Sequence, residues 1–351
     1  MDWTSSMQQT FEYCEVDPNT WKDARRLDMF SSCKIDWDAE TDTLGSASYE
    51  VYDYLDECYV RAYMIAIQNG VKNKIPLGTF LVQSPSDNFD GKRHKYSIEG
   101  YTPLIELKES SPPLGYSIPK DSDILAEAYL VTKNHVRAPV VKPTGSDKLV
   151  GDFISNIGDT WFTFNHDLLA NASFSYDLDE MGRILFAPNQ DTASLAPVWT
   201  YDDGNSSILY PDISIEADIY NVPNVVEVLY SVNSGYLYSK AVNNDPNSPT
   251  STVSRGREIV YRVTDPDLYG VANQPQIDAY AEQVLRNMSS LKYRVSYSHG
   301  YNGVRVNDCV RLNYERAGLY GVKAKVISQS ITCDTGCVVS ETAIFTKKLW
   351  R

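Results

Sequence analysis

The sequence lacks any long hydrophobic run and any excess of basic charge. None of its 351 residues belongs to a stretch approaching the ~18 consecutive apolar residues of a membrane-spanning helix. The first residues, MDWTSSMQQTFEYCEVD, have neither the basic region nor the apolar run of a signal peptide. The formal net charge of −14 argues against the basic face that nucleic-acid binding requires. We therefore expect a protein made in the cytoplasm, without a membrane span.

Residues that ligate metals are few and scattered. The six cysteines lie far apart except for Cys333 and Cys337, and no second Cys/His pair accompanies these two to complete a tetrahedral zinc site. The four histidines are also far apart in sequence: His94, His135, His166 and His299. We expect Cys333 and Cys337 to be strand residues around an Asp-Thr-Gly turn, and we expect no metal site and no cofactor.

Familiar catalytic motifs are missing as well. The chain contains no P-loop, dinucleotide fingerprint, G-x-S-x-G or HExxH motif. The segment HGYNG at 299–303 has the glycines of an oxyanion hole, but no nucleophile on a strand–turn–helix accompanies it. A hairpin bracketed by glycines explains this segment better. We therefore predict no catalytic residue.

Acidic and aromatic residues give no catalytic pattern either. A glycosidase needs two carboxylates held at a set separation across a sugar cleft. The sequence singles out no such pair, and we expect its close acidic pairs to lie on solvated loops and strand faces: Asp36 with Asp38, and Asp53 with Asp56. Three aromatic residues have the chemistry of a sugar platform, but their helical setting favours core packing: Trp161, Phe162 and Phe164.

The segment DLDEMGRILF, residues 177–186, is the one place where acids and a glycine gather as in a metal loop. Asp177, Asp179 and Gly182 match positions one, three and six of an EF-hand calcium loop. Position five is Met181, which has no oxygen, and position twelve is Pro188 instead of the closing glutamate. The flanking FSYDL and RILFA alternate like strands. The pattern favours a hairpin whose turn needs a glycine with positive φ.

Composition and the positions of turn-forming residues predict a mainly β protein with an α/β insert. Tyrosine is abundant at 25 residues, which favours strands. The break SSPPLGYSIPKDSD, at 110–123, separates a strand-rich first block from a block with two helical segments. We expect three domains: an N-terminal β-domain at 1–112, an inserted α/β domain at 113–205 and a second β-domain at 206–351.

The last block contains the clearest helix and the most polar segment. QPQIDAYAEQVLRNMSS, near 274–290, places apolar residues along one helical stripe after Pro275. The segment at 239–256, SKAVNNDPNSPTSTVSRG, has few residues that could bury area, so we expect a mobile loop with little role in the fold. Four strands with glycine turns follow the helix and predict a barrel or sandwich.

The order of these blocks resembles the hub proteins of phage tail baseplates and of related contractile injection systems, including the hub portion of type VI secretion spikes. The resemblance includes a D-x-x-G-R hairpin at Asp179–Arg183 and an A-x-x-x-L helix at Ala281–Leu285. It also includes a G-D-x-V element in which Asn307 replaces the glycine. The stretches that carry it are LGTFLVQSP, HKYSIEGYTPLIELK, DTWFTFNHDLLANASFSYDLDEMGRILFAP, YNVPNVVEVLYS, YAEQVLRNMSSLKYRVSYSHGYNGVRVNDCVRLNY and GVKAKVISQSI.

The resemblance implies two tube-like β-barrels in each chain and a homotrimer. Three chains would form a pseudo-sixfold ring in the tail tip of a virion. The ring would join a tail tube or distal tail protein to a central spike or tail fibre, with a tape measure protein as a further partner. DNA would pass through without specific binding. Two other classes stay open: a carbohydrate- or receptor-binding tail-tip protein, and a tail-associated cell-wall hydrolase.

Overall fold

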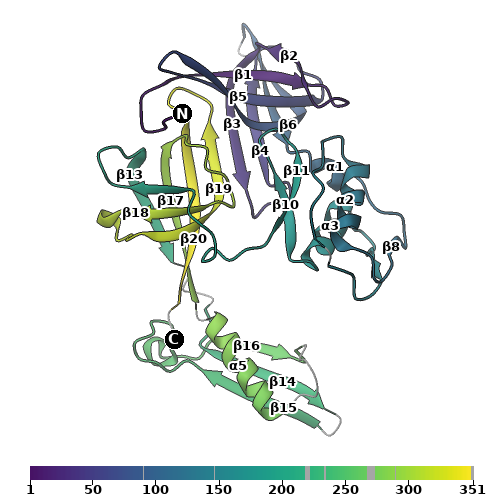
Figure 1. Ribbon diagram of the computed structural model, residues 1–351, viewed down its shortest axis with the longest axis vertical. Helices are drawn as coiled ribbons and strands as arrows, with labels where there is room; N and C mark the ends of the chain where they lie inside the picture. The colour runs from purple at the N-terminus through teal and green to yellow at the C-terminus, as the bar shows by residue number, and fades with distance from the viewer. Residues whose placement is uncertain are drawn as a thin grey trace. The chain divides into compact units, whose positions relative to one another are not determined.

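The structure is a computed structural model whose placed residues divide into two compact units. One unit contains Met1–Asp212 and Tyr297–Thr342, and the other contains Ile213–Ser296 and Ala343–Arg351. Most of the regular structure is β, as Figure 1 shows, so the expected mainly β class is confirmed. The structure describes residues 1–89, 91–145, 147–217, 222–232, 235–266, 273–288 and 290–348.

The N-terminal strands form an antiparallel sheet in the order β3-β4-β7-β6-β5-β1-β2. Alternate residues of these strands face one core, which contains Tyr49, Met64, Phe80 and Ile98. The strands are β1 (Gln8–Val16), β2 (Asp23–Leu27), β3 (Phe30–Asp38), β4 (Gly45–Val51), β5 (Cys58–Gln68), β6 (Val71–Phe89) and β7 (His94–Tyr101).

The C-terminal strands continue the same sheet. β19 pairs with β3 antiparallel, from Ser328 opposite Asp38 to Thr332 opposite Lys34. Beyond β19 the order is β20, β17 and β13, and β18 joins β19 to β12. These strands are β12 (Trp199–Asp202), β13 (Leu209–Ala217), β17 (Ser290–Gly300), β18 (Cys309–Asn313), β19 (Val322–Thr332) and β20 (Val338–Lys348).

The two separate tube-like barrels expected from the resemblance are not found as closed barrels among the described residues. One 13-stranded sheet takes their place. The reason is the pairing of β3 with β19. Because the backbone groups on that edge of β3 already have partners, the edge cannot pair with another strand to close either half of the sheet on itself. The four predicted terminal strands are all present as β17 to β20.

The middle of the chain forms a small module with its own core. Its elements are α1 (Ile105–Lys108), β8 (Ser117–Ile118), α2 (Ile124–His135), β9 (Phe153–Ile154), α3 (Trp161–Ala170), β10 (Phe174–Leu178) and β11 (Ile184–Pro188). Asp123 caps α2 by accepting a hydrogen bond from the Ala126 amide, 2.9 Å away. Thr160 and Thr163 cap each other at the start of α3. The second helical region is shorter than expected, because the residues before Thr160 contain β9.

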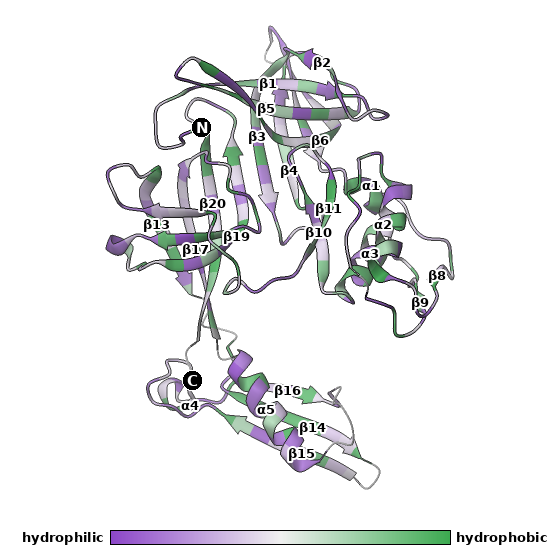
Figure 2. Ribbon diagram, in the orientation of Figure 1, coloured by the Kyte–Doolittle hydropathy of each residue, from purple (hydrophilic) through white to green (hydrophobic). Residues whose placement is uncertain are grey.

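The second unit contains a three-stranded sheet and the predicted late helix. β14 (Val225–Val232) pairs with β15 (Gly235–Val242) on one side and β16 (Val260–Thr264) on the other. α5 (Gln274–Met288) buries Ile277, Ala281 and Leu285 against this sheet. Figure 2 shows hydrophobic and hydrophilic residues alternating along α5, as an amphipathic helix requires. The expected boundaries at 112 and 205 do not coincide with the boundary between the two units.

The polar segment at 239–256 is packed, so the expectation of a mobile loop is wrong. Its first residues end β15, and α4 (Thr252–Arg255) lies near its end. Asn243, Ser248 and Thr250 are fully buried, and the Asn243 amide donates to the Ser248 hydroxyl at 3.1 Å. Burial of these side chains is tolerated because they hydrogen-bond one another. Composition alone could not reveal that pairing.

This packing predicts that Asn243→Ala destabilises the protein. The substitution removes the hydrogen bond from Asn243 to the buried Ser248 hydroxyl, which keeps only its bond with Thr250, and this costs about 0.5–1.5 kcal/mol. Asn247, an exposed asparagine of the same segment, is the matched control. Urea unfolding of both alanine variants measures the difference. Equal stability of the two variants would show that the segment contributes nothing to the fold.

Candidate functional site

The segment DLDEMGRILF forms the predicted hairpin. β10 and β11 pair antiparallel, with Leu178 opposite Ile184. The turn closes through hydrogen bonds from the Asp179 amide to the Arg183 carbonyl (3.1 Å) and from the Gly182 amide to the Asp179 carbonyl (2.9 Å). Gly182 has a φ of +73°, in the left-handed region where a side chain is disfavoured. The hairpin prediction is therefore confirmed.

Arginines occupy the places around the hairpin acids that a cation would take. Asp179 accepts hydrogen bonds from the Arg183 amide at 2.8 Å and from its Nε at 2.5 Å. Glu180 pairs with the Arg305 Nε at 2.6 Å. Among the described residues, no group of three His, Cys, Asp or Glu is placed to hold a metal ion. The negative charge of the turn is thus balanced within the protein.

Arg61 on β5 holds the hairpin turn from the side of the N-terminal strands. Its side chain is 1% exposed. Its guanidinium donates to the Thr79 hydroxyl (2.8 Å), the Asp23 carboxylate (2.8 Å) and the Met181 carbonyl (3.0 Å). The Trp21 indole donates to the same Met181 carbonyl at 2.7 Å. A backbone oxygen of the turn is therefore fixed by two donors of the N-terminal part.

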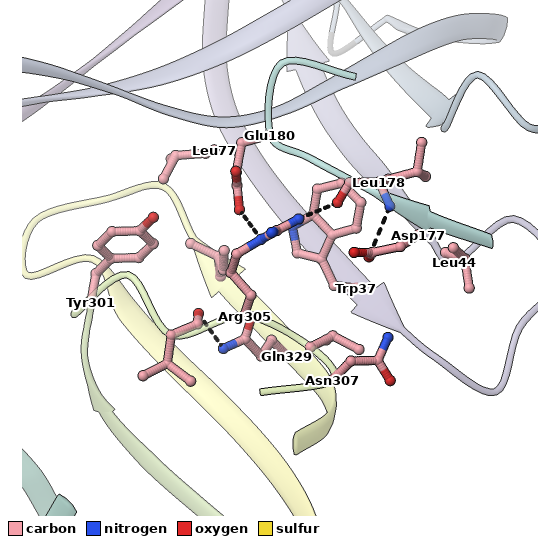
Figure 3. A pocket seen from close by; sticks show the side chains of 13 residues that line it. Trp37, Leu44, Leu77, Asp177, Leu178, Glu180, Tyr301, Arg305, Asn307 and Gln329 are labelled. Atoms are coloured by element: carbon pink, nitrogen blue, oxygen red, sulfur yellow. Dashed lines mark hydrogen bonds and ion pairs between the residues drawn. The ribbon is translucent and has the colours of Figure 1, made fainter. Parts of the chain in front are cut away.

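Arg305, in the loop after β17, holds the hairpin from the side of the C-terminal strands. It donates to the Leu178 carbonyl and pairs with Glu180, as Figure 3 shows. Its own amide donates to the Asp308 carboxylate at 2.8 Å, which orders the loop. We call the contacts of Arg61 and Arg305 with residues 178–181 the hairpin clamp. The clamp joins segments far apart in sequence.

A small cavity lies beside the clamp. Its lining comes from five parts of the chain and includes Trp37, Leu77, Asp177, Tyr301, Arg305 and Gln329 (Figure 3). The cavity has a volume of about 40 Å³. That space holds one or a few waters, whereas pockets for small organic ligands measure roughly 300–1,000 Å³. The cavity is therefore a small gap between packed segments of the chain.

Two carboxyl groups near the clamp are disfavoured in their charged form. Burial raises the pKa of Asp177, against the opposing effect of the Arg305 guanidinium. Burial also raises the pKa of Asp308, while its hydrogen bond from the Arg305 amide opposes the shift. Arg305 therefore favours the charged form of both carboxyls, against the effect of burial.

A buried polar cluster that sequence reasoning missed surrounds His299. The His299 Nε2 lies 2.5 Å from the Glu341 carboxylate and 2.9 Å from the Tyr201 hydroxyl. Asn302 donates to the same hydroxyl, and Gln329 donates to Glu341. His299 and Glu341 have fully buried side chains, so no substrate reaches them. The cluster links β12, β17, β19 and β20 through charge-assisted hydrogen bonds.

The segment at 299–303 is neither an oxyanion hole nor a hairpin. His299 and Gly300 end β17, whose neighbours in the sheet are β13 and β20. The strand that follows in sequence, β18, pairs with β12 and β19 instead. The predicted hairpin is therefore wrong, because the chain leaves β17 for a strand that does not pair with it.

The remaining candidates occupy structural positions. Cys333 and Cys337 lie in the turn between β19 and β20, outside both strands, so their prediction as strand residues is wrong. Both are buried free thiols, and burial raises the pKa of Cys337. The three aromatic residues of α3 are buried in the module core, as expected: Trp161, Phe162 and Phe164.

Of the two acidic pairs, Asp53 and Asp56 are exposed, as expected, whereas Asp36 and Asp38 are half-buried. Asp36 on β3 pairs with Lys34 at 3.0 Å, and Asp38 accepts a hydrogen bond from the Glu40 amide at 2.8 Å. Asp53 and Asp56 lie in the turn between β4 and β5. No described helix is long and apolar enough to cross a membrane.

The fold is that of phage tail proteins. The chain is similar to a tail protein of Neisseria meningitidis MC58, with a TM-score of 0.68 at 14% identity, covering 97% of this chain and 98% of that one. It is also similar to the 43 kDa tail protein of prophage MuSo2 from Shewanella oneidensis, with a TM-score of 0.65 at 12% identity over 96% and 98% of the chains. A chain of the Francisella PdpA–VgrG complex matches with a TM-score of 0.56 at 9% identity, over 97% of this chain and 53% of that chain. No family model and no curated sequence matches.

The raised pKa of Asp177 predicts a pH-dependent effect of Asp177→Asn. A folded-state pKa above the unfolded value means that the folded protein binds the proton more tightly. Below the unfolded pKa of about 3.9, the Asp177 carboxyl therefore lowers the free energy of unfolding least. As pH rises through the folded pKa, the carboxyl lowers the free energy of unfolding by a growing amount. We expect the variant to gain stability relative to wild type as pH rises from the unfolded pKa of about 3.9 through the higher folded pKa. Urea unfolding against pH measures this, with Asp53→Asn as the exposed control. A difference that does not change with pH would contradict the assignment.

Proposed function

We propose that the protein is a structural hub of a phage tail tip or of a related injection machine. The observation that carries this proposal is the similarity over nearly the whole length of both chains, 97% of this chain and 98% of the Neisseria meningitidis tail protein. A match of that extent covers both β portions, the module between them and the late helix. It supports a role that uses the whole chain rather than a single site.

The arrangement of strands supports a ring built from three copies. Each chain has two β portions, β1–β7 before the module and β12, β13 and β17–β20 after it. If each portion supplies one wall segment, three chains supply six, which matches a sixfold tail tube on one side. Threefold symmetry of the chains themselves matches a central spike or tail fibre on the other. A distal tail protein and a tape measure protein are further proposed partners in the virion.

The charge of the chain supports a channel for DNA. With a net charge of −14, the protein repels phosphates, so DNA gains little from counterion release at its surface. A conduit of this charge would let DNA pass without stopping. Specific DNA binding is not part of the proposal.

The chemistry at the described sites favours a structural role over catalysis. Two of the hairpin acids are paired with arginine, and the cavity beside them has room for water only. His299 and Glu341, the most catalytic-looking pair, are fully buried. These groups act by joining strands of the fold.

The proposal predicts that the purified protein is a trimer with a central hole. Mass photometry or light scattering gives the mass, and negative-stain electron microscopy gives the symmetry. We expect three copies of the 39.5 kDa chain and threefold or pseudo-sixfold rings. A protein that remains monomeric at all concentrations, and forms no ring with tail-tube or spike partners, would contradict the proposed function.

A further inference from the structure

The outer edge of β15 carries backbone groups that have no strand beside them. The three-stranded sheet has the order β15-β14-β16, so β14 covers only one side of β15. The Asn243 amide donates to the Asn224 carbonyl at 2.8 Å, which continues the β14–β15 register. Because backbone groups alternate along an antiparallel strand, those of Lys240 and Val242 point away from β14. No described residue donates a hydrogen bond to these outward backbone groups or accepts one from them.

A groove runs between this edge and α5. The helix packs against β15 and β14 on one face of the sheet (Figure 1). The β15 side chains on that face are small at this point, Ser239 and Ala241, and they leave room beside the helix. The groove has a volume of about 570 Å³, within the roughly 300–1,000 Å³ of ligand sites. Its second wall is one row of α5 side chains: Asp278, Glu282 and Arg286.

Gln274 shows that the outward groups of β15 accept hydrogen bonds from beside the strand. Its side-chain amide donates to the Tyr238 carbonyl at 2.8 Å. Tyr238 lies two residues before Lys240, so its carbonyl belongs to the same outward row. An N–H of α5 therefore takes the place that a strand's donor would have at this end of the row. At the other end, beyond Val242, the chain turns inward at the fully buried Asn243.

The outward groups of Lys240 and Val242 are complementary to an extended polypeptide. Each of the two residues presents an N–H and a C=O toward the groove, and the two sets lie about 7 Å apart. Another β-strand presents acceptors and donors with the same repeat. A polypeptide in extended conformation is the class of ligand that pairs with all four groups at once. We call the open edge and the row of α5 side chains the β15–α5 groove.

Asp278 adds a preference for a basic side chain. Its carboxylate accepts a hydrogen bond from the Gln274 amide at 2.9 Å and has no ion pair with a described residue. Glu282, in contrast, pairs with Arg286 at 2.7 Å. The negative charge of the α5 wall that lacks a cation is therefore that of Asp278. Since side chains alternate along a strand, every second residue of a bound segment would lie over this wall.

We propose that the β15–α5 groove binds an extended segment of another protein, which adds a strand beside β15 and places a basic side chain over Asp278. A second copy of this chain suits the edge less well. Twofold pairing of two β15 edges would bring the Lys240 side chains of both copies close together, and the proposed ring has no twofold axis. The inference goes beyond the proposed ring, and it rests on that ring only in choosing another protein over a second copy.

The first test asks whether binding uses the backbone of the ligand. The probe is a short synthetic peptide of alternating threonine and lysine, added to the whole protein. We expect slower hydrogen exchange at the Lys240 and Val242 amides. A strand donates toward a given neighbour only from alternate residues. N-methylation of all lysines or of all threonines should therefore abolish binding in one peptide and spare it in the other. Equal effects of the two methylation patterns would contradict strand pairing.

The second test removes one donor of the edge. Val242→Pro deletes the outward N–H and leaves the β14–β15 hydrogen bonds, at a position where an edge strand tolerates proline. The dissociation constant of the threonine–lysine peptide should rise about tenfold, because a backbone hydrogen bond is lost. Val242→Ala keeps the N–H, so it is the matched control and should bind like wild type. Circular dichroism melting checks that both variants fold.

The third test concerns the charge of Asp278. This residue is exposed, so Asp278→Asn leaves the core of the second unit unchanged. The variant should bind the threonine–lysine peptide about threefold to tenfold more weakly, because an ion pair at the surface is lost. Binding of a threonine–glutamine peptide should not change. If the variant binds the lysine peptide as wild type does, the preference for a basic side chain is wrong.

The outcomes separate this inference from the proposed function. If the peptide binds but wild type forms no ring, the β15–α5 groove stands and the ring fails. If the ring forms and the peptide leaves exchange at Lys240 and Val242 unchanged, the groove is overturned while the hub role stands. If Val242→Pro prevents ring formation and Val242→Ala does not, the edge binds a second copy, and the assignment of another protein is overturned.

Discussion

The fold depends on how the backbone of one acidic turn is held by two arginines. The carbonyl oxygens of residues 178 and 181 point away from the hydrogen bonds between the two strands of the hairpin. Without other donors, these buried oxygens would lower the free energy of unfolding by their full desolvation penalty. Arg61 reaches the Met181 carbonyl, and Arg305 reaches the Leu178 carbonyl. Because Arg61 lies on β5 and Arg305 follows β17, the two bonds join the first and last parts of the chain.

The same principle accounts for the other polar sites in the interior. The hairpin acids, the His299–Glu341 pair and the buried side chains around Asn243 each have a charged or hydrogen-bonding partner. A buried charge without its partner would strongly destabilise the folded protein. Each buried pair therefore fixes which strands lie together. These pairs hold strands of the fold together, which is what the proposed structural role requires.

Local patterns predicted the local structure well and the long-range pairing poorly. The helix at Gln274–Met288 and the hairpin at 177–186 follow from apolar periodicity and turn residues, which are encoded by neighbours in sequence. The joining of β3 to β19, and of Arg61 to Met181, involves residues separated by more than a hundred positions. No rule based on the spacing of residues in the sequence predicts such contacts. Composition also misjudged the segment at 239–256, since buried polar residues look the same as solvated ones in a sequence.

Hydrogen exchange of a Gly182→Ala variant tests the clamp most directly. A Cβ at Gly182 would lie 2.8 Å from the Thr79 Cβ, at a φ of +73°, so the turn must shift away from its arginines. Gly158→Ala is the control, because its φ is +96° but no atom lies within 4 Å. We expect faster exchange at the Gly182 amide and also at Asn307 and Val326, whose amides order the Arg305 loop. Faster exchange confined to the turn itself, or equal to that of the control, would contradict the account that one clamp couples both ends of the chain.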